Sequence, residues 1–302
     1  MILGVRNVEN INNFNIKIKG KLNLEDYKEI NQLQSLCHEV DKVSLKLELD
    51  YKLSRSEVEG KNIGDLNEFL YYYENMLVGY IGICEFGGAA MEINGMVHPD
   101  FRRRGIFKKL FSLVKDEGGK RNPKKILLLS DNNSISGLEF IKSTGAEHHH
   151  SEYEMFLRRN SETNSSDNNV VLRSATNEDG REIAWQNSIY FNEEFKEENI
   201  PMPEEEEKCG ILMFIAEVDN KVIGKVNIEI REGVGGIYGL GVIPEYRGRG
   251  YGREILTKAV KIMQEKGAKD IMLQVEAKNK NALNLYKSCG FEETYTMDYY
   301  KL

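Results

Sequence analysis

The chain has 302 residues, of which 40% are hydrophobic and 29% are charged, and its formal net charge is −7. This length predicts about two domains of ordinary size, each large enough to bury a core without disulfides. The acidic balance argues against broad nucleic-acid binding, which usually relies on a basic face.

The first half of the chain carries a weaker copy of a segment that returns later. Val97–Phe107 matches Val242–Gly252 when 145 is added to each residue number. The same offset keeps turn glycines, a proline and apolar strand positions in one register from about Gly79 to Gly145, with no gap. This agreement indicates a duplicated domain, and we expect residues 1–159 to form its first copy.

Residues 160–169 contain no apolar side chain and lie where the duplication requires a boundary, so they are predicted to be a linker. A second domain, residues 170–302, should follow. Its predicted elements are a strand at Val170–Arg173, a helix beginning near Asn177–Asp179, strands at Leu212–Val218, Val222–Ile230 and Gly236–Val242, a helix from near Gly250 to near Gly267, a strand at Asp270–Val275 and a helix at Asn279–Cys289. Crossovers through helices imply a mixed sheet in each half.

The segment Arg247-Gly248-Arg249-Gly250-Tyr251-Gly252 follows a strand and opens a helix. Its glycines let backbone N–H groups approach a ligand closely, and a helix N-terminus adds partial positive charge, so the segment suits a pyrophosphate. Its two arginines can add charge-assisted contacts. Arg253 stands where a Rossmann loop needs its third glycine, and Gly-Lys-Ser/Thr is absent, so neither nucleotide motif applies. Ordinary turn chemistry is the alternative reading.

Two motifs carry a resemblance to a known family. The pattern Arg247-x-x-Gly250-x-Gly252 resembles the acetyl-CoA motif Gln/Arg-x-x-Gly-x-Gly/Ala of the GNAT superfamily of N-acetyltransferases. Downstream, Asn279-x-x-Ala282-x-x-Leu285-Tyr286-x-x-x-Gly290-Phe291 resembles the last conserved block of the family, in which the tyrosine is the usual general acid. The resemblance covers roughly residues 170–302 and, less well, residues 24–158. It implies a tandem GNAT protein of the α/β (α+β) class, in which each domain is a mixed, mostly antiparallel sheet flanked by helices.

The resemblance further implies an acetyl-CoA-dependent N-acetyltransferase in which a primary amine attacks the thioester directly. Tyr286 would protonate the leaving thiolate, and helix packing is the alternative reading of its ring. A backbone N–H near Leu240 would polarise the thioester carbonyl, and Asn279 would hold the cofactor near its pantetheine end. The expected cofactor-binding residues are Leu240, Gly241, Val242, Arg247, Gly248, Arg249, Gly250, Tyr251, Gly252 and Asn279.

The general base is left open by the sequence. Glu276 follows the strand beside the expected gap between strands and could act directly or through water. Glu217 and Glu229 are rivals. For all three, a surface carboxylate is the simpler reading.

The first half lacks the counterparts of these residues. The offset of 145 takes Tyr286 to Ile141, Asn279 to Ser134 and Gly252 to Phe107. An isoleucine cannot give a proton, and a phenylalanine adds bulk where a helix amide should approach phosphate. We expect the first half to keep the fold without this catalytic apparatus, unless a neighbouring phenol such as Tyr153 takes the role.

The acceptor is only broadly constrained. Between Glu193 and Glu207 there are eight glutamates and one lysine. By resemblance this region helps to line the acceptor site, where acidic residues would attract a cationic amine such as a polyamine, an amino sugar or a basic peptide end. A solvated loop is the alternative. A different class of function is a non-catalytic acyl-CoA-binding sensor or scaffold, and the oligomeric state is open.

The cysteines and the start of the chain bear on location. Four cysteines show no CxxC or zinc-type spacing and read as free thiols in a reducing compartment. The first apolar run is too short for a signal-peptide core, and none is long enough to cross a bilayer. We therefore expect a cytoplasmic protein that uses no metal, membrane or nucleic acid. His148–His150 are read as a solvated turn, since neighbours on a strand point to opposite faces.

Overall fold

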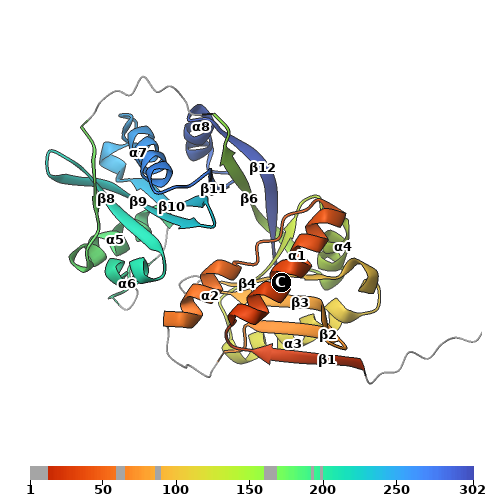
Figure 1. The fold of residues 1–302 in the computed structure, drawn as a ribbon. Helices are drawn as coiled ribbons and strands as arrows, with labels where there is room; N and C mark the ends of the chain where they lie inside the picture. Colours follow the sequence, from red (N-terminus) through yellow and green to blue (C-terminus); the bar gives the residue numbers. More distant parts are fainter. Residues whose placement is uncertain (1–12, 59–64, 86–89, 160–168, 192–193, 198–199) are drawn as a thin grey trace, which may run out of the picture. The chain divides into compact units, whose positions relative to one another are not determined.

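The computed structural model describes residues 13–58, 65–85, 90–159, 169–191, 194–197 and 200–302. The chain forms two compact units, each with helices packed against a mixed sheet (Figure 1). The N-terminal unit runs to His148 and also contains Tyr299–Leu302, while the C-terminal unit is His149–Asp298. This confirms the predicted fold class. No helix in the described ranges is long and apolar enough to cross a membrane.

The sheet of the N-terminal unit has the strand order β1-β2-β3-β4-β5. β4 and β5 pair in parallel, and the other neighbours pair antiparallel. The elements are β1 (Phe14–Lys19), α1 (Leu24–Asp41), α2 (Leu49–Val58), β2 (Glu68–Tyr73), β3 (Met76–Cys84), β4 (Met91–Val97), a 3-10 turn (Pro99–Phe101), α3 (Ile106–Arg121), β5 (Ile126–Asp131) and α4 (Ile135–Thr144).

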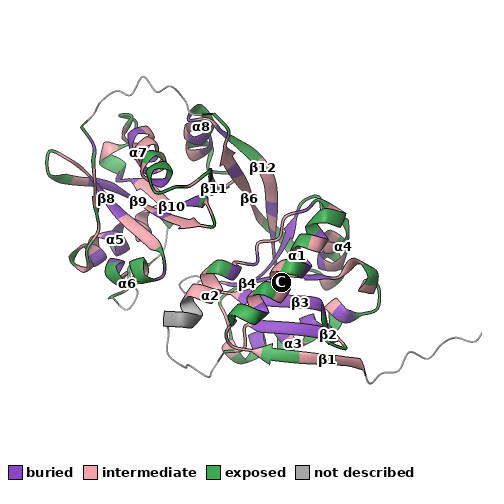
Figure 2. Cartoon of the chain, viewed as in Figure 1, coloured by how far each residue is buried: buried purple, intermediate pink, exposed green. Residues whose placement is uncertain are grey.

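Alternation along β2 gives this sheet two apolar faces. Because successive strand residues point to opposite sides, Phe69 and Tyr71 pack in one cluster with residues of α3, and Leu70 and Tyr72 pack in another with residues of α1. The central strands are therefore buried on both faces, while α1 turns an exposed side to solvent (Figure 2).

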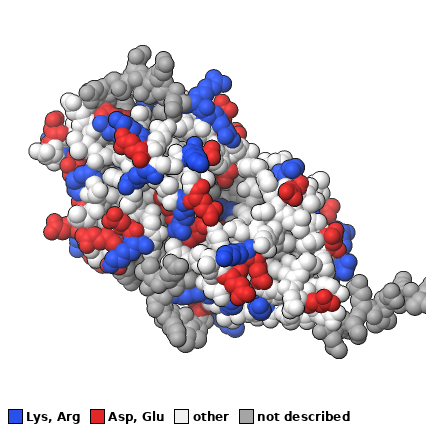
Figure 3. All heavy atoms as spheres, in the orientation of Figure 1, with Lys and Arg blue, Asp and Glu red and all other residues white. Residues whose placement is uncertain are grey.

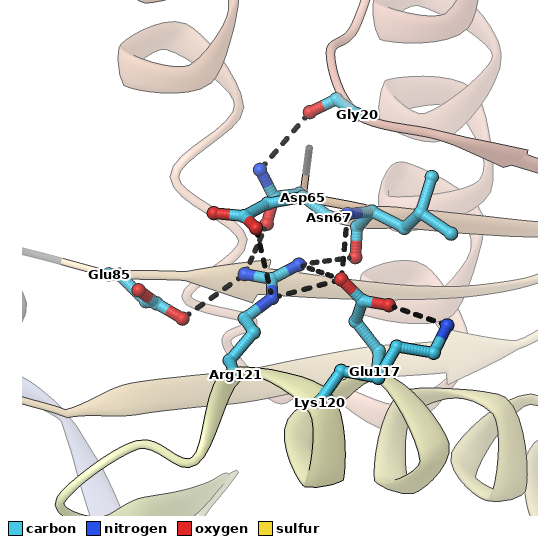
Figure 4. A network of polar contacts seen from close by, with 8 residues as sticks. Gly20, Asp65, Asn67, Glu85, Glu117, Lys120 and Arg121 are labelled. Carbon is cyan, nitrogen blue, oxygen red and sulfur yellow. Dashed lines mark hydrogen bonds and ion pairs between the residues drawn. The ribbon is translucent and has the colours of Figure 1, made fainter. Parts of the chain in front are cut away.

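A polar network fixes the C-terminal end of α3 to the start of β2 (Figure 4). Arg121 donates hydrogen bonds to Glu117 at 3.0 Å, Asn67 at 2.9 Å, Glu85 at 3.1 Å and the Leu66 carbonyl at 2.8 Å. The Leu66 amide donates to Glu117 at 3.0 Å. The Arg121 and Glu117 side chains are only 10% and 5% exposed. The two buried charges are therefore compensated within this network.

The sheet of the C-terminal unit has the strand order β12-β6-β11-β10-β9-β8-β7. β10 pairs with β11 in parallel, and β6, β9, β8 and β7 join by antiparallel pairing. The elements are β6 (Glu147–Leu157), β7 (Val171–Ser174), a 3-10 turn (Asn177–Asp179), α5 (Gly180–Phe191), α6 (Pro203–Lys208), β8 (Ile211–Val218), β9 (Lys221–Arg231), β10 (Val234–Val242), a 3-10 turn (Pro244–Tyr246), α7 (Tyr251–Glu265), β11 (Asp270–Glu276), α8 (Lys280–Ser288) and β12 (Phe291–Lys301). Each predicted element of this half is present within a few residues of its expected bounds.

The two units exchange strands, which the duplication did not predict. β6 follows α4 in the first half of the sequence, yet it pairs with β11 from Met272↔Phe156 to Glu276↔Glu152 in the C-terminal unit. Conversely, the amide of Leu302 donates to the Ile126 carbonyl at 3.0 Å, so the end of β12 borders β5 in the N-terminal unit. Each sheet is thus completed by residues from the other half of the sequence.

The exchange bears on two expectations. His148–His150 lie within β6, so the predicted solvated turn is wrong; the strand continues through them because β6 has a partner strand. Of the predicted linker, residues 160–169, only Asn169 is described. The division of the sequence into 1–159 and 170–302 stays a prediction.

Candidate active site

The duplicated turn is repeated at the level of single hydrogen bonds. Arg247 Nε donates to the Val242 carbonyl at 2.8 Å, and Arg102 Nε donates to the Val97 carbonyl at 3.1 Å in the other half. Both pairs are related by the offset of 145. The guanidinium of Arg247 is thus held across its own turn through Nε. Its two terminal amino groups make no ion pair with a described residue.

Helix α7 begins without a side-chain cap. Its N-cap, Gly250, is left-handed with φ 88°, and Gly248 before it has φ 76°. Such conformations favour glycine because a Cβ would be strained there. The first N–H groups of the helix have no intrahelical acceptor and point out of its end. Gly252 lies against the side chains of Leu285 and Val242, so the space next to its Cα is occupied by apolar atoms.

Apolar packing holds α7 in this position. Four of its side chains, Ile255, Leu256, Ala259 and Met263, are fully buried in one cluster with β9, β10 and β11. They recur at helical spacing, as the sequence predicted. The amide end of α7 is therefore fixed next to the C-terminal end of β10.

Strand β10 carries a bulge next to that end. β9 and β10 pair in register up to Tyr238↔Asn227, and pairing resumes one residue out of step at Gly241↔Lys225. The irregular residues are Gly239, which has φ 55°, and Leu240. The parallel pairing of β10 with β11 stops at Ile237↔Leu273, so the two strands separate beyond it. Leu240, Gly241 and Val242 therefore lie beyond the last pair that β10 forms with β11.

The N-terminal unit has no such bulge in its corresponding strands. β3 and β4 pair without a break from Gly79↔Val97 to Cys84↔Glu92. β4 and β5 do separate after Ile93↔Leu128. A cavity of about 480 Å³ lies at that separation and is lined largely by apolar side chains, including Phe107, Phe111, Phe140 and Ile141. The first half thus has a cavity where β4 and β5 separate, but it lacks the bulge that borders the corresponding strands of the second half.

Tyr286 lies on α8, facing the core of the C-terminal unit. Its side chain is buried, with 8% exposure, and no hydrogen bond joins its hydroxyl to any residue that the structure describes. Burial raises the pKa of Tyr286 to about 12. A tyrosine is protonated at neutral pH in any case, and this shift keeps the phenol protonated to higher pH. In the other half Ile141 takes the equivalent place, buried at 4% exposure.

Asn279 is the N-cap of α8. Its side-chain oxygen accepts a hydrogen bond from the Ala282 amide at 3.2 Å. Ser134, its counterpart, caps α4 in the same way by accepting from the Gly137 amide at 3.2 Å. Capping accounts for a polar residue at this position in both halves. The predicted cofactor contact of Asn279 stays a prediction.

All three carboxylates proposed as the general base are engaged in ion pairs. Glu217 accepts from Arg173 at 2.8 Å, and Glu276 lies 2.6 Å from the ammonium of Lys278. Glu229 pairs with Arg231 on its own strand. These partners explain the presence of the acids without a catalytic role.

Two further side chains lie beside the bulge, and the first of them was not expected from the sequence. Lys225 on β9 is 1% exposed and donates to the Gly239 carbonyl at 3.0 Å. The ring of Tyr190, from α5, lies so close to Gly241 that a Cβ there would collide with it. In the sequence, Lys221, Lys225 and Asn227 alternate with apolar residues and read as a solvent face. Lys221 is indeed exposed, whereas Lys225 is buried where α5 packs against β9 and β10.

Comparison with known proteins identifies the family of the chain. The model of the acetyltransferase (GNAT) family matches residues 28–142 and again residues 178–291. The chain belongs to the GNAT acetyltransferase family. Because the model matches once in each half, this also confirms the tandem arrangement predicted from the duplication.

Individual relatives agree with this assignment. An uncharacterized N-acetyltransferase of Methanocaldococcus jannaschii is 39% identical over 88 residues, which cover 26% of this chain and 38% of that protein. The chain thus spans well under two thirds of that relative. Among solved structures, a GCN5-related N-acetyltransferase from Sphaerobacter thermophilus has a TM-score of 0.75 at 18% identity, covering 96% of both chains. A tandem GNAT protein from the clavulanic acid biosynthesis pathway has a TM-score of 0.73 at 13% identity, covering 96% of this chain and 98% of that one. At these identities the two structures support the fold alone.

Proposed function

We propose that the protein is an acetyl-CoA-dependent N-acetyltransferase that acetylates a primary amine, with its active site in the C-terminal unit. The observation that supports the proposal is that three features expected of such a site occur in the same unit. A bulge at Gly239 and Leu240, an uncapped helix N-terminus at Gly250 and a protonated buried phenol at Tyr286 come from three separate elements of this unit. The first half retains only the second of these features.

The coenzyme fits the residues of the turn. The free amides at the start of α7 would bind the pyrophosphate, and the exposed guanidiniums of Arg247 and Arg249 would add charge-assisted contacts. The unpaired side of Leu240-Gly241-Val242 would form main-chain hydrogen bonds to the pantetheine arm. The Leu240 N–H is the donor proposed for the thioester oxygen.

The reaction then needs two proton transfers. The amine nitrogen attacks the acetyl carbonyl carbon, the C–S bond breaks, and the sulfur leaves as a thiolate. Tyr286 gives its phenolic proton to that sulfur. The proton lost by the amine goes to a base or to solvent water. A primary alkylamine has a pKa near 10, so it must be deprotonated before attack.

The acidic segment supports a cationic acceptor only in part. Arg181 pairs with Glu197 at 2.7 Å, and Lys208 pairs with Glu205 at 2.7 Å, so local partners already take up two of its charges. Acidic and basic side chains are interspersed over the face shown in Figure 3. The proposal therefore stays with a primary amine as the class of acceptor.

The test is a turnover assay with acetyl-CoA across a panel of polyamines, amino sugars and peptide N-termini, paired with calorimetry of CoA binding. We expect CoA to bind and at least one class of amine to be acetylated. CoA binding without turnover of any amine would favour a non-catalytic acyl-CoA sensor. No CoA binding would refute both functions.

A further inference from the structure

Lys225 is a buried cation without a carboxylate partner. Its side chain is among the largest that are fully buried, and the hydrogen bond to the Gly239 carbonyl at 3.0 Å is its one polar contact with the described residues. Burial lowers the pKa of Lys225 to about 8. Burying an ammonium without a compensating anion is costly, so a position that serves only packing would favour an apolar residue.

The carboxylates on the neighbouring elements contact other residues instead of Lys225. On β8, Glu217 accepts from Arg173 of β7, and on β9 itself Glu229 pairs with Arg231. On α5, Glu182 accepts from Gln186, whose side-chain oxygen in turn accepts from the Tyr190 hydroxyl. None of these carboxylates forms an ion pair with Lys225.

A second buried polar group beside the bulge also lacks a hydrogen-bond partner among the described residues. Asn227 follows on the same face of β9, and its side-chain oxygen is buried with no hydrogen-bond partner in the described part of the chain. Both Lys225 Nζ and the Asn227 amide nitrogen lie next to the Cα of Gly239, where a Cβ would meet them at 2.8 Å and 3.4 Å. Buried polar groups normally find partners, so an unsatisfied one here indicates a place that a ligand completes.

The carbonyl that Lys225 contacts has a specific relation to the proposed chemistry. The Gly239 C=O and the Leu240 N–H belong to one peptide group. A cation bound at the oxygen of a peptide draws electron density from it and makes its N–H a stronger donor. We propose that Lys225 is a positioning residue that anchors and polarises the Gly239–Leu240 peptide, so that the Leu240 N–H stabilises the charge developing on the thioester oxygen. This inference rests on the proposed N-acetyltransferase function.

The other half of the chain provides an internal comparison. There Tyr80 takes the place of Lys225 and Asn94 takes the place of Gly239, and the strand has no bulge. The Tyr80 hydroxyl donates to Glu68, and Lys52 donates to both of them, so this buried polar network is closed on itself. The unpaired lysine therefore occurs in the unit with the bulge, and a compensated network occurs in the unit without it.

The experiment measures the thioester carbonyl directly. Difference infrared spectroscopy of bound acetyl-CoA, labelled with 13C at the acetyl carbonyl, reports how strongly the oxygen is polarised. We expect a lower stretching frequency in the wild type than in Lys225→Met. The turnover number of the variant should fall roughly 10-fold to 100-fold, with CoA affinity and the KM for acetyl-CoA nearly unchanged. Tyr80→Phe, at the matching position of the other unit, should leave frequency and turnover unchanged.

The pH dependence of the carbonyl frequency in the wild type provides a second test. As the pH rises through about 8, Lys225 loses its proton and the carbonyl frequency should rise with the same midpoint. An equal frequency and turnover in Lys225→Met, or a wild-type frequency that does not change with pH, would overturn the inference while leaving the proposed function intact. Loss of CoA binding in the variant would also overturn it, because it would assign Lys225 to holding the bulge. A wild type that binds CoA but acetylates no amine would instead refute the proposed function.

Discussion

The rings of Phe107 and Phe140 meet edge to face with their centroids 4.6 Å apart, at the positions that Gly252 and Leu285 occupy in the other half. The contact between α3 and α4 in one unit is thus the counterpart of the contact between α7 and α8 in the other. In one half an aromatic pair forms this contact, and in the other a glycine without a side chain lies against a leucine. The difference between the halves at this point is one of steric access.

Side-chain size at Gly252 should therefore control coenzyme binding. Gly252→Phe adds a ring at the start of α7, where a Cβ alone would already contact Leu285 and Val242, and we expect the affinity for CoA to fall by about 10-fold or more, which corresponds to at least about 1.4 kcal/mol. Gly252→Ala is the matched control. Its Cβ would meet Leu285 at 3.4 Å, an ordinary contact, so calorimetry should give nearly wild-type affinity. Equal affinities for both variants would contradict the proposed cradle.

Removing the phenolic proton of Tyr286 should affect chemistry without affecting binding. We expect Tyr286→Phe to lower the turnover number on the order of 10²-fold while CoA affinity is retained, because general acid catalysis contributes about that much. Tyr153→Phe on β6 is the control and should keep the wild-type rate. Steady-state kinetics with the best amine of the panel measures both. A fully active Tyr286→Phe would remove Tyr286 from the mechanism.

The buried ammonium of Lys225 should make stability depend on pH. Its pKa is about 8 in the folded protein and near 10.5 when exposed, so the unfolded chain binds more protons between these values. The cost of burying the charge is complete below pH 8, and the free energy of unfolding should rise from there to about pH 10.5 by about 3 kcal/mol. Urea titrations of the wild type and Lys225→Met would isolate this effect. A difference between them that is constant with pH would contradict it.

The network around Arg121 should contribute strongly to the stability of the N-terminal unit. Arg121→Met leaves the buried carboxylate of Glu117 without its main partner, and we expect a loss of about 3 kcal/mol in the free energy of unfolding. Arg103→Met is the comparison, since its ion pair with Glu139 is 89% and 65% exposed and should change stability by less than about 0.5 kcal/mol. Chemical denaturation checks both, and similar losses would contradict the structural reading.

Strand exchange predicts which fragments remain folded. A fragment of residues 170–302 lacks β6, so β11 loses the neighbour that covers its edge. Unpaired strand edges promote aggregation. We expect this fragment to be insoluble or poorly structured, and a fragment of residues 149–302 to be soluble with cooperative unfolding. Circular dichroism and sedimentation distinguish the two, and equally well-folded fragments would show that β6 is dispensable.

Local patterns predicted most of the fold and the turn of the site. Glycines, caps and apolar periodicity act over a few residues, so the strand, the left-handed Gly250 and helix α7 can be read in chain order. The pairing of β6 with β11 could not be, because it joins residues more than a hundred positions apart and goes against the order of the duplication. Lys225 was missed because its alternation with apolar neighbours is that of an exposed strand face. Its burial depends on α5, which comes from elsewhere in the chain.

The exchange of β6 and the end of β12 makes the fold of each half depend on residues of the other half. The first half of the sequence supplies an inner strand, β6, to the C-terminal unit, and the N-terminal unit receives the end of β12 in return. The first half is therefore needed for the fold of the C-terminal unit, independently of any chemistry of its own. Deletion of either copy would leave the sheet of the other incomplete.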